Sequence, residues 1–223
     1  MTRLRLAAFD VDGTLVDSAG SIVAGVLDCW GACGFPAPDP VLVRRIIGLP
    51  WEESVLALLP GAGEAEFARI RAYHDEVARG LRTRPARQEC LFPGVHETLD
   101  ALENAGLLLS IITSRPLKRL QELLDGHGLT GRFMVLKTTD HGPGKPAPDL
   151  MFQTLAEIGV DRDATVMVGD TIFDMAMARS AGTAAIGVSW GVHEAHELQD
   201  AGADQVVDEF HQLPAVIARL TGG

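Results

Sequence analysis

Short runs of hydrophobic residues alternate along this chain with stretches in which apolar residues recur at helical spacing. Because these runs are continuous, they are typical of strands buried on both faces. Their alternation with helical stretches predicts an α/β fold, a Rossmann-like parallel sheet core with helices on both faces. The expected strands cover residues 4–9, 107–112, 133–137, 164–168, 184–188 and 205–207.

One long stretch breaks this rhythm, because residues 19–81 contain no convincing strand pattern. Apolar residues from Ile22 to Trp30 mark one helical face, and three further helical segments follow, separated by Pro50, Pro60 and Gly61. We therefore predict an inserted all-helical cap domain at 18–82 and a core formed by 1–17 and 83–223. Residues 82–94 are expected to be the return linker, and the insert is placed to act as a lid.

The composition limits the classes of function. The 223 residues are 47% hydrophobic and 22% charged, which is enough for a sizeable core. A net charge of −11 argues against a nucleic-acid-binding face, although a locally positive pocket can still bind a small anion. The cysteines do not suggest a disulfide framework, and no segment resembles a signal peptide or membrane span. We expect a cytoplasmic monomer or homodimer that binds neither nucleic acid nor membranes.

Polar side chains gather where the predicted strands end. Because the carboxyl ends of parallel strands meet at one edge of a sheet, residues distant in sequence should lie together there. The four clusters are Asp10, Asp12, Gly13 and Thr14; Thr113 and Ser114; Lys145; and Gly169, Asp170 and Asp174.

The chemistry of these clusters is complementary. Asp10 and Asp170 offer the hard oxygen ligands that Mg²⁺ prefers. The hydroxyls of Thr113 and Ser114, with the amides near Gly13 and Thr14, can donate hydrogen bonds to phosphoryl oxygens, and Lys145 can offset their charge. With one aspartate attacking phosphorus and another moving protons, the set supports covalent phosphoryl transfer.

Simpler interpretations exist for several of these residues. Thr113 and Ser114 could cap the helix that starts near Pro116, and Asp170 and Asp174 could be a helix N-cap and a first-turn acid. Calcium-loop and P-loop patterns fail, because Leu15, Ser21, Thr139 and Pro146 stand at positions those motifs require to be different. His193 and His196 are three residues apart rather than the four that the zinc motif needs.

The segments "DVDGTLVDS", "IITSRP", "GKPAPD" and "VGDTIFD" resemble, in order, the four motifs of the haloacid-dehalogenase-like hydrolase superfamily. The likeness is to its phosphoglycolate-phosphatase-like branch with a helical cap. It implies that Asp10 is the nucleophile, that Asp12 transfers protons and ligates Mg²⁺ through its carbonyl, and that Thr113 and Lys145 hold the phosphoryl group. It also implies metal roles for Asp10, Asp170 and Asp174. Arg45, Leu49 and Trp51, near the "GLPWEE" turn, are implied to select the substrate.

The expected function is that of a Mg²⁺-dependent phosphatase acting on a small phosphorylated metabolite, with phosphoglycolate as the leading substrate. A pyrophosphatase, a nucleotide phosphatase, a sugar phosphomutase and a non-catalytic protein that binds a phosphorylated ligand remain alternatives. Ser114–Arg115–Pro116 departs from the Asn–Lys–Pro usual in phosphoglycolate phosphatases. The sequence assigns no role to His141 or His193.

Overall fold

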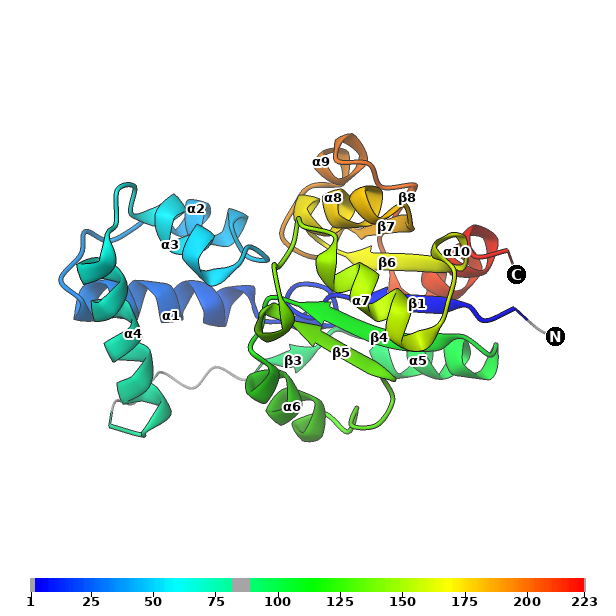
Figure 1. Cartoon of the computed structure of the whole chain (residues 1–223), viewed down its shortest axis with the longest axis horizontal. Helices are drawn as coiled ribbons and strands as arrows, with labels where there is room; N and C mark the ends of the chain where they lie inside the picture. Colours follow the sequence, from blue (N-terminus) through cyan, green and yellow to red (C-terminus); the bar gives the residue numbers. More distant parts are fainter. Residues whose placement is uncertain (1–2, 82–88, 223) are drawn as a thin grey trace.

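A computed structural model describes residues 3–81 and 89–222 and places six strands in one parallel sheet. The order across the sheet is β5-β4-β1-β6-β7-β8 (Figure 1). Every run predicted to be a strand belongs to it, so the predicted fold class is confirmed. The strands are β1 (Leu6–Phe9), β4 (Leu108–Thr113), β5 (Val135–Thr138), β6 (Thr165–Gly169), β7 (Ala184–Val188) and β8 (Gln205–Val207).

Helices cover both faces of the sheet, which explains why the strands read as continuous apolar runs. Ala7 and Phe9 of β1 pack in one core, whereas Ala8 between them packs in another. The first core includes α5 (Val95–Asn104), α6 (Leu117–Gly126) and α10 (Leu213–Leu220). The second includes α7 (Asp149–Ile158), α8 (Ile172–Ala181) and α9 (Ala195–Asp200). Short 3-10 helices lie at Thr139–His141, Arg162–Ala164 and Phe210–Gln212.

The chain order reverses at β1, which pairs with β4 on one side and β6 on the other. In open parallel sheets this reversal opens a crevice at the carboxyl ends of the strands, where ligands bind. The residues that follow β1, β4 and β6 therefore meet there.

Residues 19–81, called the insert below, contain helices and no strand. They lie beside the sheet at one end of the molecule (Figure 1). The insert has its own apolar core, formed around Trp30, Val55 and Ile70. Its helices are α1 (Ala19–Ala32), α2 (Pro40–Arg45), α3 (Trp51–Leu58) and α4 (Glu64–Ala78). The boundary predicted at 82/83 falls outside the described residues.

Two short strands join the insert to the sheet. β2 (Val16–Asp17) lies before α1, and β3 (Cys90–Leu91) lies on the return; they pair antiparallel. Neither strand was predicted, because a strand of two residues is too short to show a hydrophobic period.

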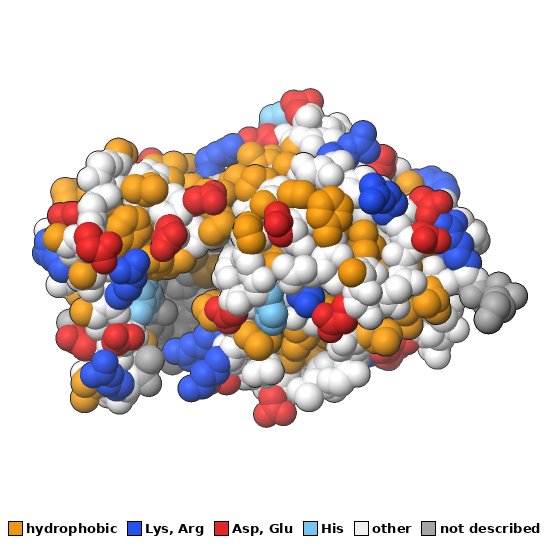
Figure 2. All heavy atoms as spheres, viewed as in Figure 1, with side chains coloured by type: hydrophobic (Ala, Val, Ile, Leu, Met, Phe, Trp, Pro, Cys, Tyr) orange, Lys and Arg blue, Asp and Glu red, His pale blue; other side chains and the backbone are white. Residues whose placement is uncertain are grey.

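No helix in the described residues combines the length and apolar character needed to cross a bilayer. On the face seen in Figure 2, acidic and basic side chains are intermixed over both the insert and the sheet region.

Candidate active site

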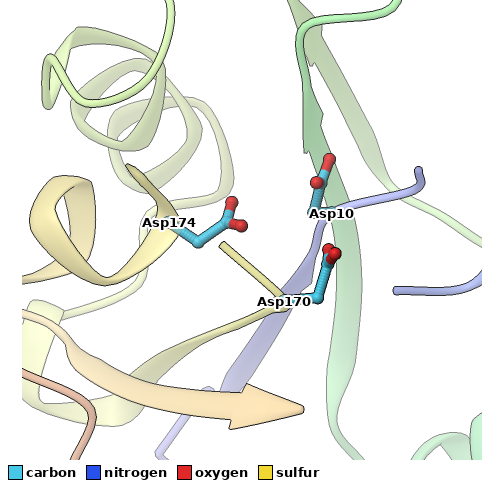
Figure 3. A group of neighbouring side chains, drawn as sticks. All are labelled: Asp10, Asp170 and Asp174. Atoms are coloured by element: carbon cyan, nitrogen blue, oxygen red, sulfur yellow. The ribbon is translucent and has the colours of Figure 1, made fainter. Parts of the chain in front are cut away.

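Three buried aspartates meet at the carboxyl edge of the sheet. Asp10 follows β1, Asp170 follows β6, and Asp174 lies in the first turn of α8, with their carboxylates facing a common point (Figure 3). One carboxylate oxygen from each lies within 4.8 Å of the others, and each residue is at most 1% exposed. Among the described residues this is the only group of three or more potential metal-ligating side chains.

Lys145 reaches the same point from the loop after β5 and is fully buried. Its Nζ lies 2.8 Å from Asp10 Oδ2 and 2.8 Å from Asp174 Oδ1. Asp174 also completes a capping box with Thr171, the N-cap of α8, whose amide donates to Asp174 Oδ2 at 3.1 Å. Asp174 is therefore both a structural helix residue and a member of the cluster, and the N-cap is Thr171 rather than Asp170.

The cluster holds more negative than positive charge. Burial raises the pKa of Asp10 to about 7, with Lys145 opposing this shift and Asp174 adding to it. Burial, and then the neighbouring carboxylates of Asp10 and Asp174, raise the pKa of Asp170 well above its usual value. Burial disfavours the charge on Lys145, but the Asp10 and Asp174 carboxylates outweigh it and raise the pKa of that ammonium group.

Two hydrogen-bond donors fix the carboxylate of Asp170, and two neighbouring glycines have no side chain that would collide with it. Thr14 Oγ1 donates to Asp170 Oδ1 at 2.8 Å, and the Val192 amide donates to Oδ2 at 2.9 Å. Gly13 has a φ of 88°, and a Cβ there would lie 2.1 Å from Asp170 Oδ2. A Cβ at Gly191 would lie 2.2 Å from the Cβ of Asp170. Sequence reasoning missed Gly191, whose only local signal was the Trp–Gly pair after a strand.

Asp12 has a different environment, because it pairs with an arginine. Arg115 Nε donates to Asp12 Oδ2 at 3.1 Å, while its Nη2 pairs with Asp12 Oδ1 and lies 3.0 Å from Glu89 Oε2. Burial alone would raise the pKa of Asp12, but the Arg115 charge and hydrogen bonds outweigh burial and hold this pKa below its usual value. Arg115 was visible in the sequence only as a departure from the family pattern, because its contact with Asp12 spans 103 positions.

Thr113 and Ser114 follow β4 at the same edge. Thr113 Oγ1 accepts from the Arg115 amide at 3.2 Å, and Ser114 Oγ donates to the carbonyl of Gly48 in the insert at 2.6 Å. No side-chain hydrogen bond from the N-cap closes α6; the Leu117 amide donates instead to Asp140 Oδ2 at 2.8 Å. Helix capping is therefore not the role of Thr113 or Ser114.

The insert packs directly over this edge. Arg44 Nη2 donates to the Gly191 carbonyl at 2.8 Å, and Ile47 packs with Ala19 and Val192. Arg45 forms an ion pair with Glu197 of α9. These contacts, with the bond from Ser114, hold the insert against the edge of the sheet where the aspartates are buried.

The remaining residues singled out from the sequence lie in varied settings. Trp51 packs within the insert, with its ring 5.5 Å from that of Phe67. His193 is 3% exposed, and its Nδ1 has no hydrogen-bond partner in the described part of the chain. His141 Nδ1 accepts from the Thr138 amide at 3.1 Å, so this ring closes a local turn.

The Arg45–Glu197 pair predicts a pH dependence of the contact between insert and sheet. The hydrogen bond from Arg45 and that from the Glu194 amide lower the pKa of Glu197 from 4.5 to about 2. Because the pKa of Glu197 is lower in the folded state than in the unfolded state, its ionised form stabilises the folded state at pH values above about 4.5. This contribution is lost as the pH falls through about 2. Between about pH 4.5 and 2, the Tm of wild type should therefore fall more steeply than that of Glu197→Gln. Equal slopes would contradict the prediction, and high salt should reduce the difference, because the pair is exposed.

The acidic cluster has the features of a site for a hard divalent cation. Its donors are carboxylate oxygens, and Asp10 Oδ1 is buried without a hydrogen-bond partner among the described residues. Burial, and after it the mutual repulsion of the carboxylates, raises the pKa values of Asp10 and Asp170, so a bound cation would favour their ionised forms. A cation held by few carboxylates and several waters, as Mg²⁺ usually is, fits this set.

Comparison with known proteins agrees with this geometry. The sequence matches the family described as haloacid dehalogenase-like hydrolase over residues 7–188, which is more than half of the chain. The chain belongs to this family. Probable phosphatase IndB of Dickeya dadantii (strain 3937) is 35% identical to it, over 93% of this chain and 91% of the relative.

Two further proteins resemble this chain over almost its whole length. N-acetylmuramic acid 6-phosphate phosphatase of Pseudomonas aeruginosa strain PAO1 is 30% identical over 98% of both chains. The crystal structure of a predicted phosphoglycolate phosphatase from Haemophilus somnus 129pt has a TM-score of 0.83 and 25% identity, covering 97% of this chain and 99% of that one. The predicted family and its phosphoglycolate-phosphatase-like branch are thus confirmed, and with them the class of enzyme, a phosphatase-type hydrolase.

Proposed function

We propose that this chain is a Mg²⁺-dependent phosphatase that hydrolyses a small phosphorylated metabolite through a phosphoaspartyl intermediate on Asp10. The observation that carries the proposal is the arrangement of Asp10 itself. Lys145 Nζ lies 2.8 Å from its Oδ2 as an ion pair, and neither oxygen of this buried carboxylate has a hydrogen-bond partner among the described residues. A buried carboxylate that a single cation orients and that no hydrogen-bond donor engages is available for nucleophilic attack.

The proposed reaction has two displacements at phosphorus. In the first, Asp10 Oδ1 forms a bond to phosphorus, the bond to the leaving oxygen breaks, and Asp12 gives that oxygen a proton. In the second, Asp12 takes a proton from water, which attacks phosphorus and releases Asp10 and inorganic phosphate. The pair with Arg115 keeps Asp12 ionised, as the second step requires, and the negative phosphoryl group would raise its pKa for the first.

The other site residues would hold the reacting groups. The Thr113 hydroxyl would donate to phosphoryl oxygens. The Gly13 and Thr14 amides donate to the carbonyls of Val16 and Val11, and the Ser114 hydroxyl donates to that of Gly48, so these groups would have to exchange partners to bind the phosphoryl group. Asp10, Asp170 and the carbonyl of Asp12 would ligate Mg²⁺, with Asp174 supporting its waters. When bound, the ion would offset negative charge on the phosphoryl group.

The insert completes this proposal as a cap. We place the cap at 18–82 and the catalytic core at 1–17 and 83–223. The contacts of Arg44, Ile47 and Gly48 with the sheet edge support a closed position that excludes water. Arg45 and Trp51 would then select the substrate, although Arg45 is paired with Glu197 and Trp51 packs within the insert in this structure.

The substrate class follows from the relatives and the site. Phosphoglycolate is the leading substrate, and the name of the Haemophilus somnus protein supports it. The Pseudomonas aeruginosa relative is named for N-acetylmuramic acid 6-phosphate, which makes this sugar phosphate the second compound to test.

Phosphate release with and without metal tests the function. Wild type should hydrolyse p-nitrophenyl phosphate with Mg²⁺, and EDTA should lower kcat/KM at least about 100-fold, since a catalytic ion supplies several kcal/mol. Adding excess Mg²⁺ should restore the rate. A panel containing phosphoglycolate, N-acetylmuramic acid 6-phosphate, pyrophosphate, nucleotides and hexose phosphates then ranks the substrates.

Each outcome of this assay has a distinct meaning. No Mg²⁺-dependent release from any compound would overturn the proposal and favour a non-catalytic binding protein. Preference for pyrophosphate or nucleotides would replace the small metabolite as the proposed substrate. Transfer of phosphate between sugar hydroxyls would indicate a mutase.

A further inference from the structure

An ion-pair network connects Asp12 with both segments that join the insert to the sheet. Its members, called the Asp12 network, are Asp12, Arg115, Glu89 and Ser21. Arg115 contacts both carboxylate oxygens of Asp12, and its Nη2 lies 3.0 Å from Glu89 Oε2. The Ser21 hydroxyl lies 3.0 Å from Glu89 Oε1 and 2.8 Å from the Ser18 carbonyl, so it shares its one proton between these two acceptors. Four side chains from distant parts of the sequence therefore form one continuous chain of contacts.

Arg115 is fixed more firmly than a surface arginine. Its side chain is 14% exposed, and those of Asp12 and Glu89 are 13% and 27% exposed. Its amide donates to Thr113 Oγ1 at 3.2 Å, which ties its backbone to the end of β4. A guanidinium that contacts a carboxylate through two donors fixes the plane of that carboxylate as well as its position.

The network lies where the insert meets the sheet. Ser21 is in the first turn of α1, just after β2, and Glu89 directly precedes β3. β2 and β3 pair with each other, so the outgoing and returning connections lie side by side. Any change in the position of α1 relative to β3 therefore alters the distance between Ser21 and Glu89, and through Glu89 it reaches Arg115.

We propose that Arg115 is a positioning residue that fixes the carboxylate of Asp12 for proton transfer, and that Glu89 and Ser21 tie this orientation to the insert. The inference rests on the proposed phosphatase function and extends it to Arg115, which departs from the family pattern, and to Glu89 and Ser21, which lie outside the four motifs.

The pairing leaves Asp12 able to act. An ionised carboxylate has about four lone-pair positions, and Arg115 uses one on each oxygen. The other positions remain open to water or to a leaving group. Without Arg115 the Asp12 side chain would rotate more freely, and misplacement by about 1 Å costs on the order of 10²-fold in rate. Lysine cannot reproduce the effect fully, because it donates from a single point.

Steady-state kinetics of a graded series test the proposal, with p-nitrophenyl phosphate and Mg²⁺ as the probe. Arg115→Gln should lower kcat by on the order of 10²-fold, with KM changed less than about twofold, because positioning acts on the reaction step. Arg115→Lys should retain more activity than Arg115→Gln. The loss of kcat should be larger for Glu89→Gln than for Ser21→Ala. Arg119→Gln, which removes an exposed pair with Glu122, is the matched control and should keep the wild-type kcat.

Chemical rescue separates positioning from a structural role. Guanidinium ion at concentrations that leave Tm unchanged should restore kcat of Arg115→Ala in a saturable manner, and should not restore Asp12→Asn. A wild-type kcat in Arg115→Gln would overturn the proposed role of Arg115 and leave the proposed function standing. A loss of kcat that follows unfolding and resists rescue would do the same. A wild type with no Mg²⁺-dependent release would overturn both this role and the proposed function.

Discussion

Asp10→Asn is expected to abolish phosphate release, with kcat reduced by about 10⁴-fold or more, because loss of a nucleophile removes the covalent route. Its free energy of unfolding should equal or exceed that of wild type. The substitution keeps the shape of the side chain and removes one of three buried negative charges, while Lys145 retains Asp174 as its partner at 2.8 Å. The variant should therefore be folded and inactive.

Kinetics and denaturant unfolding of the same preparation measure both parts of this prediction. Asp163→Asn is the matched control, since the Asp163 side chain is 70% exposed and pairs with surface Arg3, and it should leave activity and stability unchanged. A fluoroberyllate adduct in wild type should form on Asp10 and be absent from Asp10→Asn. An adduct on another side chain, or an Asp10→Asn variant that retains more than about 1% of wild-type kcat, would contradict the assignment.

Lys145→Met is expected to lower the free energy of unfolding by about 3–5 kcal/mol, because it removes the cation from a buried network and leaves the carboxylates unpaired. Lys145 contacts both Asp10 and Asp174, and all three side chains are at most 2% exposed. Turnover should also fall steeply, since Asp10 Oδ2 loses its only charged partner among the described residues.

Urea unfolding of paired variants tests the origin of this loss. Lys137→Met is the control, because the side chain of its partner Glu157 is 54% exposed, and an ion pair with one exposed member should contribute at most about 1 kcal/mol. The double variant Asp10→Asn with Lys145→Met should lose less stability than Lys145→Met alone, as one unpaired charge is gone. Mg²⁺ should recover part of the lost stability. A Lys145→Met variant no less stable than Lys137→Met would show that the buried charges do not need this cation.

The strands and the main site residues could be predicted because each leaves a local pattern. β1, β4 and β6 are buried on both faces and therefore appear as unbroken apolar runs. The polar residues that follow β1, β5 and β6 meet at one edge in any parallel sheet, so the sequence alone predicts that Asp10, Lys145 and Asp170 lie close together.

The substrate-selecting residues were less accessible from sequence. Arg45 is the last residue of α2, near a turn where the family resemblance places specificity residues. Whether its side chain faces a ligand or a neighbouring helix depends on how the insert packs. In the structure it pairs with Glu197, 152 positions away. The strands β2 and β3 were missed for a related reason, since their pairing rather than their composition defines them.

The sequence by itself determined the alternation of elements, the position of the insert and the residue types available for phosphoryl chemistry, because these depend on neighbours along the chain. Only the tertiary structure decided the state of each charge. Burial raises the pKa of Asp10 despite its contact with Lys145, whereas the contacts of Arg115 outweigh burial at Asp12 and lower its pKa, so carboxyl groups two residues apart have opposite pKa shifts. Burial and long-range ion pairs set those shifts, and both arise only when distant segments come together.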